Sequence, residues 1–324
     1  MRYAMAAAKP GGSGVIRKIE LGAMSPSAEE VLIRHDAIGL NFLDIYIRNG
    51  AYPWPVETDL VLGSEGAGLI EAVGSNVKGL APGDRVGYTL ANGAYASHRL
   101  IDARYVLKLP TNVSSELAAA IMLKGLTVAY LIHDSFRVES GHAVLFHAAA
   151  GGVGLIAGQW LNALGAKVIG TAGGADKCAL AKANGYHHVI DYKSADFETE
   201  VMKLTDGKGV DVTYDSVGND TMARSLTSTR RHGTIIAFGQ SSGPYFDFKI
   251  SDLARGSYKL SRPTLFHFAC ERDWLEANAA KLFAAVTDGT VNISINQKFA
   301  LEDVAKAHDA LTGRATTGST ILTV

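Results

Sequence analysis

A glycine-rich turn between an apolar strand and a helix is the segment of this chain best suited to hold a ligand. It follows a strand expected at residues 144–149, where Ala149, Gly151 and Gly154 occupy the three positions of a G-x-G-x-x-G pattern, with alanine first. Gly151 allows backbone to approach a pyrophosphate, and Gly154 allows the next helix to pack closely on the strand. The N–H groups at the helix start, including those of Gly152 and Val153, would hold the phosphates. The alternative is a tight, buried turn that binds nothing.

The next strand indicates which dinucleotide would fit. A ribose-binding Asp or Glu is expected about 20 residues past the turn, but the chain has Thr171-Ala-Gly-Gly174 there. Lys177 follows on the next helical turn, where it could donate to a 2′-phosphate. The sequence therefore predicts NADPH rather than NADH. Two alternatives stay open, because Asp176 could face the ribose and Lys177 could be an ordinary solvated residue.

The length and composition of the chain narrow the class of protein to which it can belong. A chain of 324 residues predicts two domains, and 47% hydrophobic with 19% charged residues is a globular balance. The net charge of −1 gives no electrostatic footprint for nucleic acid or an anionic membrane. Cys178 and Cys270 are the only cysteines, which fits a reducing, cytoplasmic setting. No secretory signal is evident at the N-terminus, and the apolar stretch 143–174 is interpreted as strand, turn, helix and strand rather than a membrane span.

The elements that must position the turn fall into two patterns. Before about residue 123, short β-like runs separated by Gly and Pro turns predict a β-rich lobe, with strands at 15–21, 31–38, 66–73, 85–88 and 95–100. Ser114-Ser-Glu116 is a plausible helix start. Strands then alternate with helices, which predicts a parallel sheet. We expect these strands at 144–149, 167–171, 188–191, 210–214 and 234–239, and the helices at 155–164, 175–184, 197–204 and 220–231.

The last 60 or so residues are expected to return and complete the first lobe. They carry the patterns of a helix at 274–287, a strand at 293–299, a helix at 304–311 and a final strand at 320–324.

With these elements in place, the chain resembles the zinc-independent quinone oxidoreductase branch, related to zeta-crystallin, of the medium-chain dehydrogenase/reductase superfamily. The resemblance spans essentially the whole chain. It rests on Gly39-Leu-Asn-Phe-Leu-Asp-Ile-Tyr46, Gly63-Ser-Glu-Gly-Ala-Gly68, Pro82-Gly-Asp-Arg-Val-Gly87, Ala148-Ala-Ala-Gly-Gly-Val-Gly154 and Asp215-Ser-Val-Gly218.

The resemblance implies an α/β protein with two domains. A GroES-like, mostly-β catalytic domain would comprise residues 1–122 and 262–324, and a Rossmann domain with a doubly wound parallel sheet would comprise residues 123–261. It also implies a cleft that holds nicotinamide, and a homodimer.

The resemblance bears on metal binding as well. Zinc-dependent alcohol dehydrogenases have a cysteine where this chain has Asn41 and a histidine where it has Ser64, and both are poor zinc ligands. We therefore expect no metal. Without a Lewis acid the acceptor should be electron-poor and conjugated, because such a molecule delocalises the charge that an incoming hydride leaves.

Candidate site residues follow from the same resemblance. Asn41, Asp44, Tyr46 and Tyr52 would line the nicotinamide side, and the two phenols could donate to substrate or relay a proton. Either tyrosine could instead serve packing, and Asp44 could be a structural acceptor. The residues expected to bind cofactor are Asn41, Lys124, Thr127, Gly173, Lys177, Tyr192, Ser216, Val217, Gly218, Phe238, Gly239, Gln240, Ser241, Leu265, Phe266, His267 and Arg314, together with the turn. Phe238 has an alternative as core, and Lys124 and Arg314 as surface residues.

The predicted function is NADPH-dependent reduction of a quinone without zinc. A reductase of alkenal or enone double bonds is the alternative within enzymes. A non-enzymatic crystallin-like or RNA-binding role, which the resemblance allows, is the alternative outside them.

Overall fold

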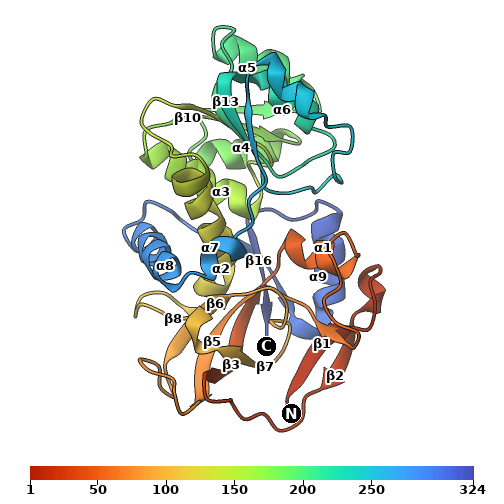
Figure 1. Cartoon of the computed structure of the whole chain (residues 1–324), viewed down its shortest axis with the longest axis vertical. Coiled ribbons are helices and arrows are strands. Elements are labelled where there is room, and N and C mark those ends of the chain that lie inside the picture. Colours follow the sequence, from red (N-terminus) through yellow and green to blue (C-terminus); the bar gives the residue numbers. More distant parts are fainter. The chain divides into compact units, whose positions relative to one another are not determined.

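The computed structural model describes all 324 residues and divides the chain into two compact units (Figure 1). The first unit contains Met1–Leu126, Phe268–Thr287 and Ile293–Val324, and the second contains Thr127–His267 and Asp288–Asn292. Helix α2 (Ser115–Tyr130) carries the chain from the first unit into the second.

Two sheets form the first unit. The smaller has the order β2-β1-β4, and the larger has the order β15-β16-β3-β5-β6-β8 with β7 paired to β3. Their bounds are β1 Tyr3–Ala7, β2 Arg17–Glu20, β3 Glu30–Gly39, β4 Leu60–Val61, β5 Glu65–Val73, β6 Arg85–Thr89, β7 His98–Asp102, β8 Val106–Lys108, β15 Ile295–Ala300 and β16 Ser319–Thr323. Strand β3 is long and largely apolar, and its residues Val31, Ile33 and Ile38 lie in the unit's hydrophobic core.

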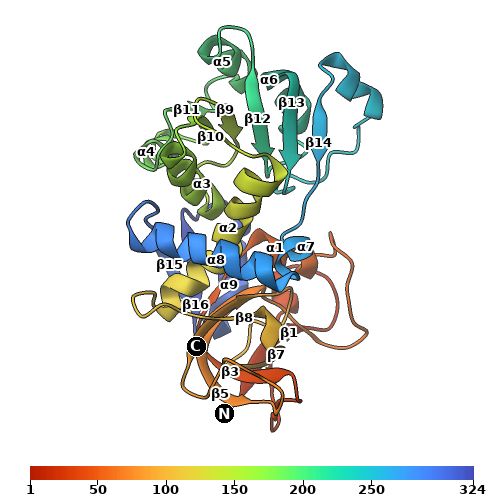
Figure 2. The ribbon, with the colours of Figure 1, turned by 60° about the vertical axis from the view of Figure 1, so that its left-hand side comes forward.

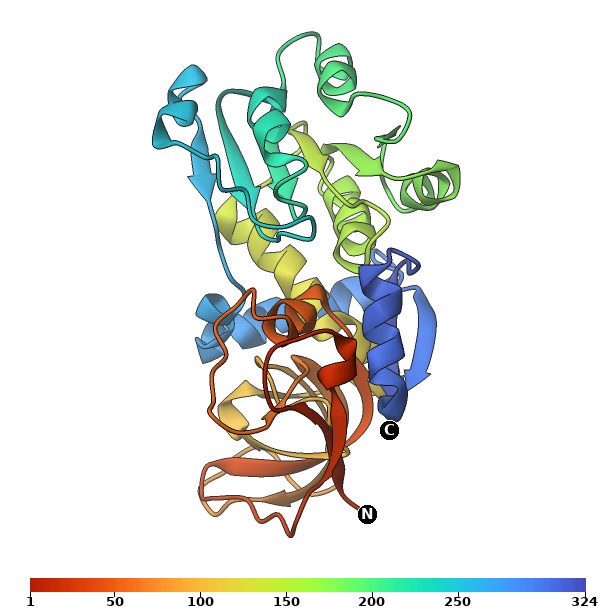
Figure 3. The same ribbon diagram turned by 90° about the vertical axis from the view of Figure 1, so that its right-hand side faces the viewer.

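Three further helices belong largely or wholly to this unit: α1 (Phe42–Arg48), α8 (Arg272–Thr287) and α9 (Val304–Thr312). Figure 3 shows α9, in dark blue, beside the red N-terminal segment, and α9 contacts both α1 and the short 3-10 helix Ser13–Val15. The C-terminal segment thus returns to the first unit, as the sequence pattern predicts.

The second unit contains one six-stranded sheet with the order β11-β10-β9-β12-β13-β14 (Figure 2). Every neighbouring pair is parallel. Counted along the chain this order is 3-2-1-4-5-6, the order of dinucleotide-binding Rossmann sheets. The predicted α/β fold class is confirmed. The strands are β9 Ala143–Phe146, β10 Lys167–Ala172, β11 His188–Asp191, β12 Val210–Asp215, β13 Thr229–Ala237 and β14 Lys259–Ser261.

The helices between these strands are α3 (Gly152–Ala163), α4 (Ala175–Ala183), α5 (Phe197–Leu204) and α6 (Met222–Ser228), and α7 (Phe266–Ala269) follows the last strand. Helices α3 and α4 pack on β10, and α6 packs on β12 and β13. The apolar residues Leu145 and Ile169 of the sheet form a core cluster with Phe197 and Val201 of α5.

Five sequence expectations on element bounds are wrong by three residues or more. The strand expected at 144–149 ends at Phe146, the helix expected at 155–164 begins at Gly152, and the strand expected at 234–239 begins at Thr229. The helix expected at 220–231 ends at Ser228, because Thr229 and, after a bulge, Thr234 to Ala237 pair with β12 as strand β13. The strand expected at 95–100 begins only at His98, because Tyr95 and Ala96 bond to the loop around Leu62 and to β1 instead.

One helical stretch, Ser115–Ser135, is long and apolar enough to cross a membrane. Of its most apolar window, 78% is buried inside the structure, which is typical of the core helix of a globular protein. The stretch 143–174 forms β9, α3 and β10, as the sequence interpretation has it.

Candidate active site

The glycine-rich turn lies where β9 leaves the sheet. The Ala149 N–H donates to Thr171 O at 3.0 Å, and Gly151 is the N-cap of α3. A Cβ on Gly154 would lie 2.4 Å from Ala148 O, so no larger residue fits without moving backbone. Ala148 itself has a φ of 55°, a left-handed conformation that is costly outside glycine.

This turn fits a pyrophosphate. The first N–H groups of α3 have no intrahelical acceptor, and they carry the positive end of the helix dipole. They stand at the carboxyl edge of a parallel sheet, next to the point where the strand order reverses, which is where such folds bind ligands.

Asp215, at the end of the neighbouring strand β12, organises the next loop. Its Oδ1 accepts from the N–H groups of Val217 and Gly218 at 2.8 and 2.9 Å, and its Oδ2 accepts from Ser225 Oγ at 2.7 Å. Ser225 in turn lies 2.9 Å from Nε2 of the buried His147, whose pKa burial lowers. These bonds fix the shape of the segment 216–218, which sequence reasoning assigned to the cofactor.

The loop after β13 is bonded to that segment. The N–H of Ser241 donates to Ser216 O at 3.1 Å, and a Cβ on Gly239 would lie 2.6 Å from the same oxygen. Phe238 is half-buried and packs on Phe146, with ring centroids 5.6 Å apart. The structure therefore brings the predicted segments 216–218 and 238–241 together at the carboxyl edge, beside the turn.

The residues predicted to meet the adenosine phosphate lie in and around the loop after β10, with Tyr192 directly after β11. Gly173 lies against the Tyr192 ring, where a Cβ would meet the phenol oxygen at 2.5 Å, and Lys177 is half-buried in the first turn of α4. The Gly174 N–H donates to Asp191 Oδ1 at 2.9 Å, and backbone donors lower the pKa of that carboxyl. Sequence reasoning missed Asp191, a carboxylate that lies 17 positions from its partner.

In the first unit, Asn41 begins helix α1 and is linked to two buried carboxylates. Its N–H donates to Asp44 Oδ2 at 3.0 Å, and its Nδ2 donates to Glu65 Oε1 at 2.8 Å. A Cβ on Gly39 would lie 2.2 Å from Glu65 Oε1, so the chain passes Glu65 closely just before α1.

Glu65 is fully buried and accepts three hydrogen bonds. Besides Asn41, Lys124 Nζ donates to Oε1 at 2.7 Å, and the Leu123 N–H donates to Oε2 at 2.7 Å. The alternative in which Lys124 is a surface residue is wrong, because only 5% of it is exposed.

Asp44 is the end of a chain of buried hydrogen bonds. Tyr95 Oη donates to Asp44 Oδ2 at 2.9 Å, and Ser64 Oγ donates to Oδ1 at 2.6 Å. His308 Nε2 lies 2.9 Å from the Tyr95 hydroxyl, and His308 Nδ1 lies 3.1 Å from Arg48 Nη1. Because arginine only donates, Nδ1 must accept and Nε2 must carry the proton. Burial raises the pKa of Asp44 to about 6 and lowers that of His308 to about 3.

The two candidate phenols also lie in this unit. Tyr46 and Tyr52 are half-buried and meet edge to face, with ring centroids 5.6 Å apart, and the Tyr52 N–H donates to Tyr46 O at 3.0 Å. Arg314 is exposed after α9, at a φ of 58°. Thr127, Leu265, Phe266 and His267 belong to the second unit, and Gln240 lies in its 238–241 loop.

The side chains of the site are not arranged to coordinate a metal ion. No group of three or more His, Cys, Asp or Glu side chains is placed to share one, and the side chains of Asn41 and Ser64 are engaged by Glu65 and Asp44. Zinc independence stays a prediction of the sequence.

This fold and these sites define a medium-chain dehydrogenase/reductase. Two family descriptions match the chain: the alcohol dehydrogenase GroES-like domain over residues 27–111, and zinc-binding dehydrogenase over residues 152–280. The quinone oxidoreductase of Pseudomonas aeruginosa is 44% identical over 314 residues, which cover 96% of each chain. A 2-haloacrylate reductase from Burkholderia is 40% identical over 322 residues, which cover 97% of this chain and 96% of the relative.

Among solved structures, that of Escherichia coli quinone oxidoreductase complexed with NADPH matches with a TM-score of 0.96. The two are 41% identical, and the match covers 99% of this chain and 100% of the other. The chain therefore belongs to the quinone oxidoreductase family of this superfamily, as the sequence motifs indicate.

Proposed function

We propose that this chain is an NADPH-dependent quinone oxidoreductase that works without zinc. The observation that carries the proposal is the glycine turn at the carboxyl edge of a 3-2-1-4-5-6 sheet, in a chain similar throughout to a quinone oxidoreductase complexed with NADPH. The sequence motifs and the comparisons therefore indicate the same cofactor, NADPH.

The chain's own residues would bind and orient the reactants. The N–H groups at the start of α3 would hold the pyrophosphate, and Lys177 would donate to the 2′-phosphate. Bound NADPH supplies the hydride. The Glu65 network fixes the Asn41 amide, so that this side chain offers a preset polar group. Tyr46 or Tyr52 would donate a proton or hydrogen bond to the developing oxyanion.

A reductase of activated double bonds is the second candidate, favoured by the similarity to a 2-haloacrylate reductase. A panel assay decides between the two. NADPH oxidation would be followed with a benzoquinone, a naphthoquinone, an ortho-quinone, a 2-alkenal and 2-chloroacrylate. We expect the highest kcat/KM with a quinone, and faster reduction of the alkenal or haloacrylate would select the alternative. Tight NADPH binding with no turnover on any member would instead favour a non-enzymatic role.

Two variants test the proton donor. If Tyr46→Phe and Tyr52→Phe each keep full turnover with a quinone, neither phenol is the acid and water protonates the product. Stoichiometric zinc in active, purified protein would contradict the metal-free mechanism. The proposal also includes a homodimer, which the family resemblance supports. It places the protein in the cytoplasm, which the low number of cysteines supports.

A further inference from the structure

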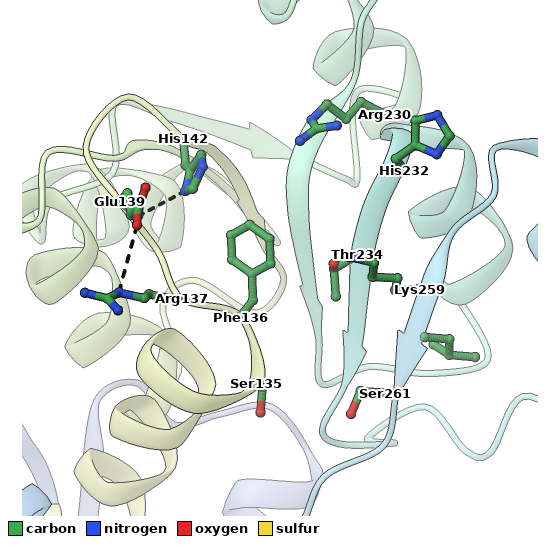
Figure 4. Close-up of a pocket in the computed structure, with 11 residues that line it drawn as sticks. Ser135, Phe136, Arg137, Glu139, His142, Arg230, His232, Thr234, Lys259 and Ser261 are labelled. Atoms are coloured by element: carbon green, nitrogen blue, oxygen red, sulfur yellow. Dashed lines mark hydrogen bonds and ion pairs between the residues drawn. The ribbon is translucent and has the colours of Figure 1, made fainter.

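A pocket of about 530 Å³ opens in the second unit, away from the glycine turn (Figure 4). His142, which immediately precedes β9, lines it together with Arg230 near the start of β13 and Lys259 at the start of β14. Parallel strands begin at one edge of the sheet and end at the other, so this pocket begins at the amino edge and extends along the sheet to Ser261, the last residue of β14. The family's cofactor would take the carboxyl edge, which leaves this pocket without an assigned ligand.

The lining is cationic. Arg137, Arg230 and Lys259 line the pocket, and Glu139 is the only carboxylate among the lining residues. Figure 4 shows the Arg137 guanidinium turned toward Glu139, away from the wall that carries Arg230. Arg137 is 84% exposed, and its Nε lies 3.9 Å from Glu139 Oε1, a loose ion pair that a ligand could displace. Arg230 Nε is held by Asp211 Oδ1 at 2.6 Å, which fixes this guanidinium. An anion entering here would meet Lys259, which has no carboxylate partner, together with Arg230 paired to Asp211 and Arg137 loosely paired to Glu139.

An irregular stretch of β13 carries two of the basic side chains. The register with β12 shifts, so that Val210 pairs with Thr229 and Val212 pairs with Thr234. Residues 230–233 therefore bulge from the ladder, and His232 takes a φ of 62°. Its N–H donates to Gly256 O at 2.8 Å, which holds the bulge in place. Bulges re-aim side chains, and this one places Arg230 and His232 along the pocket wall.

The opposite wall offers a ring and an unsatisfied hydroxyl. Phe136 is half-buried and stands beside His142, with ring centroids 5.3 Å apart, and Figure 4 shows its ring facing into the pocket. Ser135 Oγ is buried and has no hydrogen-bond partner in the protein. A buried polar atom left unpaired is costly, so the Ser135 hydroxyl would gain by rotating toward an oxygen of a bound molecule.

We propose that this pocket binds a small aromatic carboxylate. Guanidinium groups match the geometry of a carboxylate, Phe136 supplies a stacking surface for a ring, and Ser135 supplies a further hydrogen bond. The volume lies within the range of pockets for small organic ligands. The site is separate from the nucleotide turn and does not depend on the proposed reductase activity.

Calorimetric titration of the full chain, saturated with NADPH, tests the proposal with 2-hydroxybenzoate as the probe. We expect one site per chain and binding in the millimolar range or tighter. Lys259→Glu should weaken binding tenfold or more, because it replaces a cation of the lining by an anion, and Ser135→Ala should weaken it severalfold. Lys208→Glu, an exposed change elsewhere in the same unit, should leave it unaltered.

NADPH affinity, measured on every variant, should stay unchanged, which separates this site from the nucleotide turn and shows that each variant folds. Cyclohexanecarboxylate and inorganic phosphate should bind at least tenfold more weakly than the probe. Equal binding of either would overturn the aromatic carboxylate as ligand. No saturable binding, or probe binding that Lys259→Glu leaves intact, would overturn the site itself.

Discussion

The ammonium of Lys124 lies 2.7 Å from Glu65 Oε1, and both side chains are almost completely buried. The two residues stand 59 positions apart, and the pair joins α2 to the start of β5. Because Asn41 donates to the same oxygen, the ion pair also fixes the residue that begins α1.

Breaking this pair should destabilise the first unit. Lys124→Met leaves Glu65 buried without its cation, and such a loss costs about 3–5 kcal/mol. Chemical denaturation should show it directly. Lys124→Met/Glu65→Gln should lose less than the sum of the two single changes, because the remaining amide still accepts from Asn41 and carries no charge. Additive losses would mean that the two side chains do not stabilise each other.

Acid should weaken the folded state through its buried histidines. Burial lowers the pKa of His308 to about 3 and that of His35 to about 4, from an ordinary 6.5. Unfolded chains take up these protons below pH 6.5 and the folded protein does not, so stability is lost as the pH falls from 6.5 towards 4. Asp44, with its pKa raised to about 6, acts in the opposite sense, since its contribution falls as the pH rises from about 4 to 6.

Denaturation curves between pH 4.5 and 7 in matched buffers separate these contributions. His308→Gln should lose less stability than the parent as the pH falls, by on the order of 1–3 kcal/mol. Asp44→Asn should lose more, because the opposing carboxyl is gone. Parallel pH profiles for all three proteins would show that neither group titrates as its burial implies.

The glycine turn should tolerate no side chain at Gly154. The Cβ of Gly154→Ala would meet two backbone carbonyl groups, at 2.4 and 2.7 Å, so the turn must shift. We expect NADPH affinity, from fluorescence titration, to fall at least tenfold. Gly12→Ala is the matched control, because its Cβ meets nothing within 4 Å and its φ is −67°. Unchanged affinity in Gly154→Ala would exclude this turn as the pyrophosphate site.

Lys177 should set the preference for NADPH. Lys177→Ala removes the proposed partner of the 2′-phosphate, and we expect the ratio of NADPH to NADH affinity to fall about tenfold, with NADH binding unchanged. Lys182→Ala, an exposed lysine in the last turn of the same helix, should change neither. A preference that survives Lys177→Ala would remove this lysine from cofactor recognition.

The features that the sequence predicted correctly depend on residues that lie close together in the chain. The strand, turn and helix around Gly151 lie within about 20 residues, and the alternation of strands and helices after residue 123 specifies a Rossmann sheet by a short-range pattern. The error in the predicted C-terminal end of α6 comes instead from a long-range interaction. Nothing local in Thr229 to Arg231 separates helix from strand, and the pairing of Thr229 and of Thr234 to Ala237 with β12 decides it.

The buried network around Asp44 was beyond sequence reasoning because its partners are remote. Tyr95 lies 51 positions from Asp44, and His308 lies 213 from Tyr95 and 260 from Arg48. The sequence did offer one signal, since Glu65 directly follows Ser64 inside a motif that carries the family resemblance. His308 lies in an amphipathic helix, and its neighbours in the sequence give no such signal.

The pairing of β16 with β3, in which Ile321 lies opposite Gly39, constrains how the protein is made. During synthesis the whole Rossmann sheet leaves the ribosome before Ser319–Thr323, the strand that pairs with this edge of β3. Until then β3 exposes unpaired backbone that other chains could capture. Truncation of the final six residues should therefore lower the soluble yield far more than the loss of so short a tail suggests.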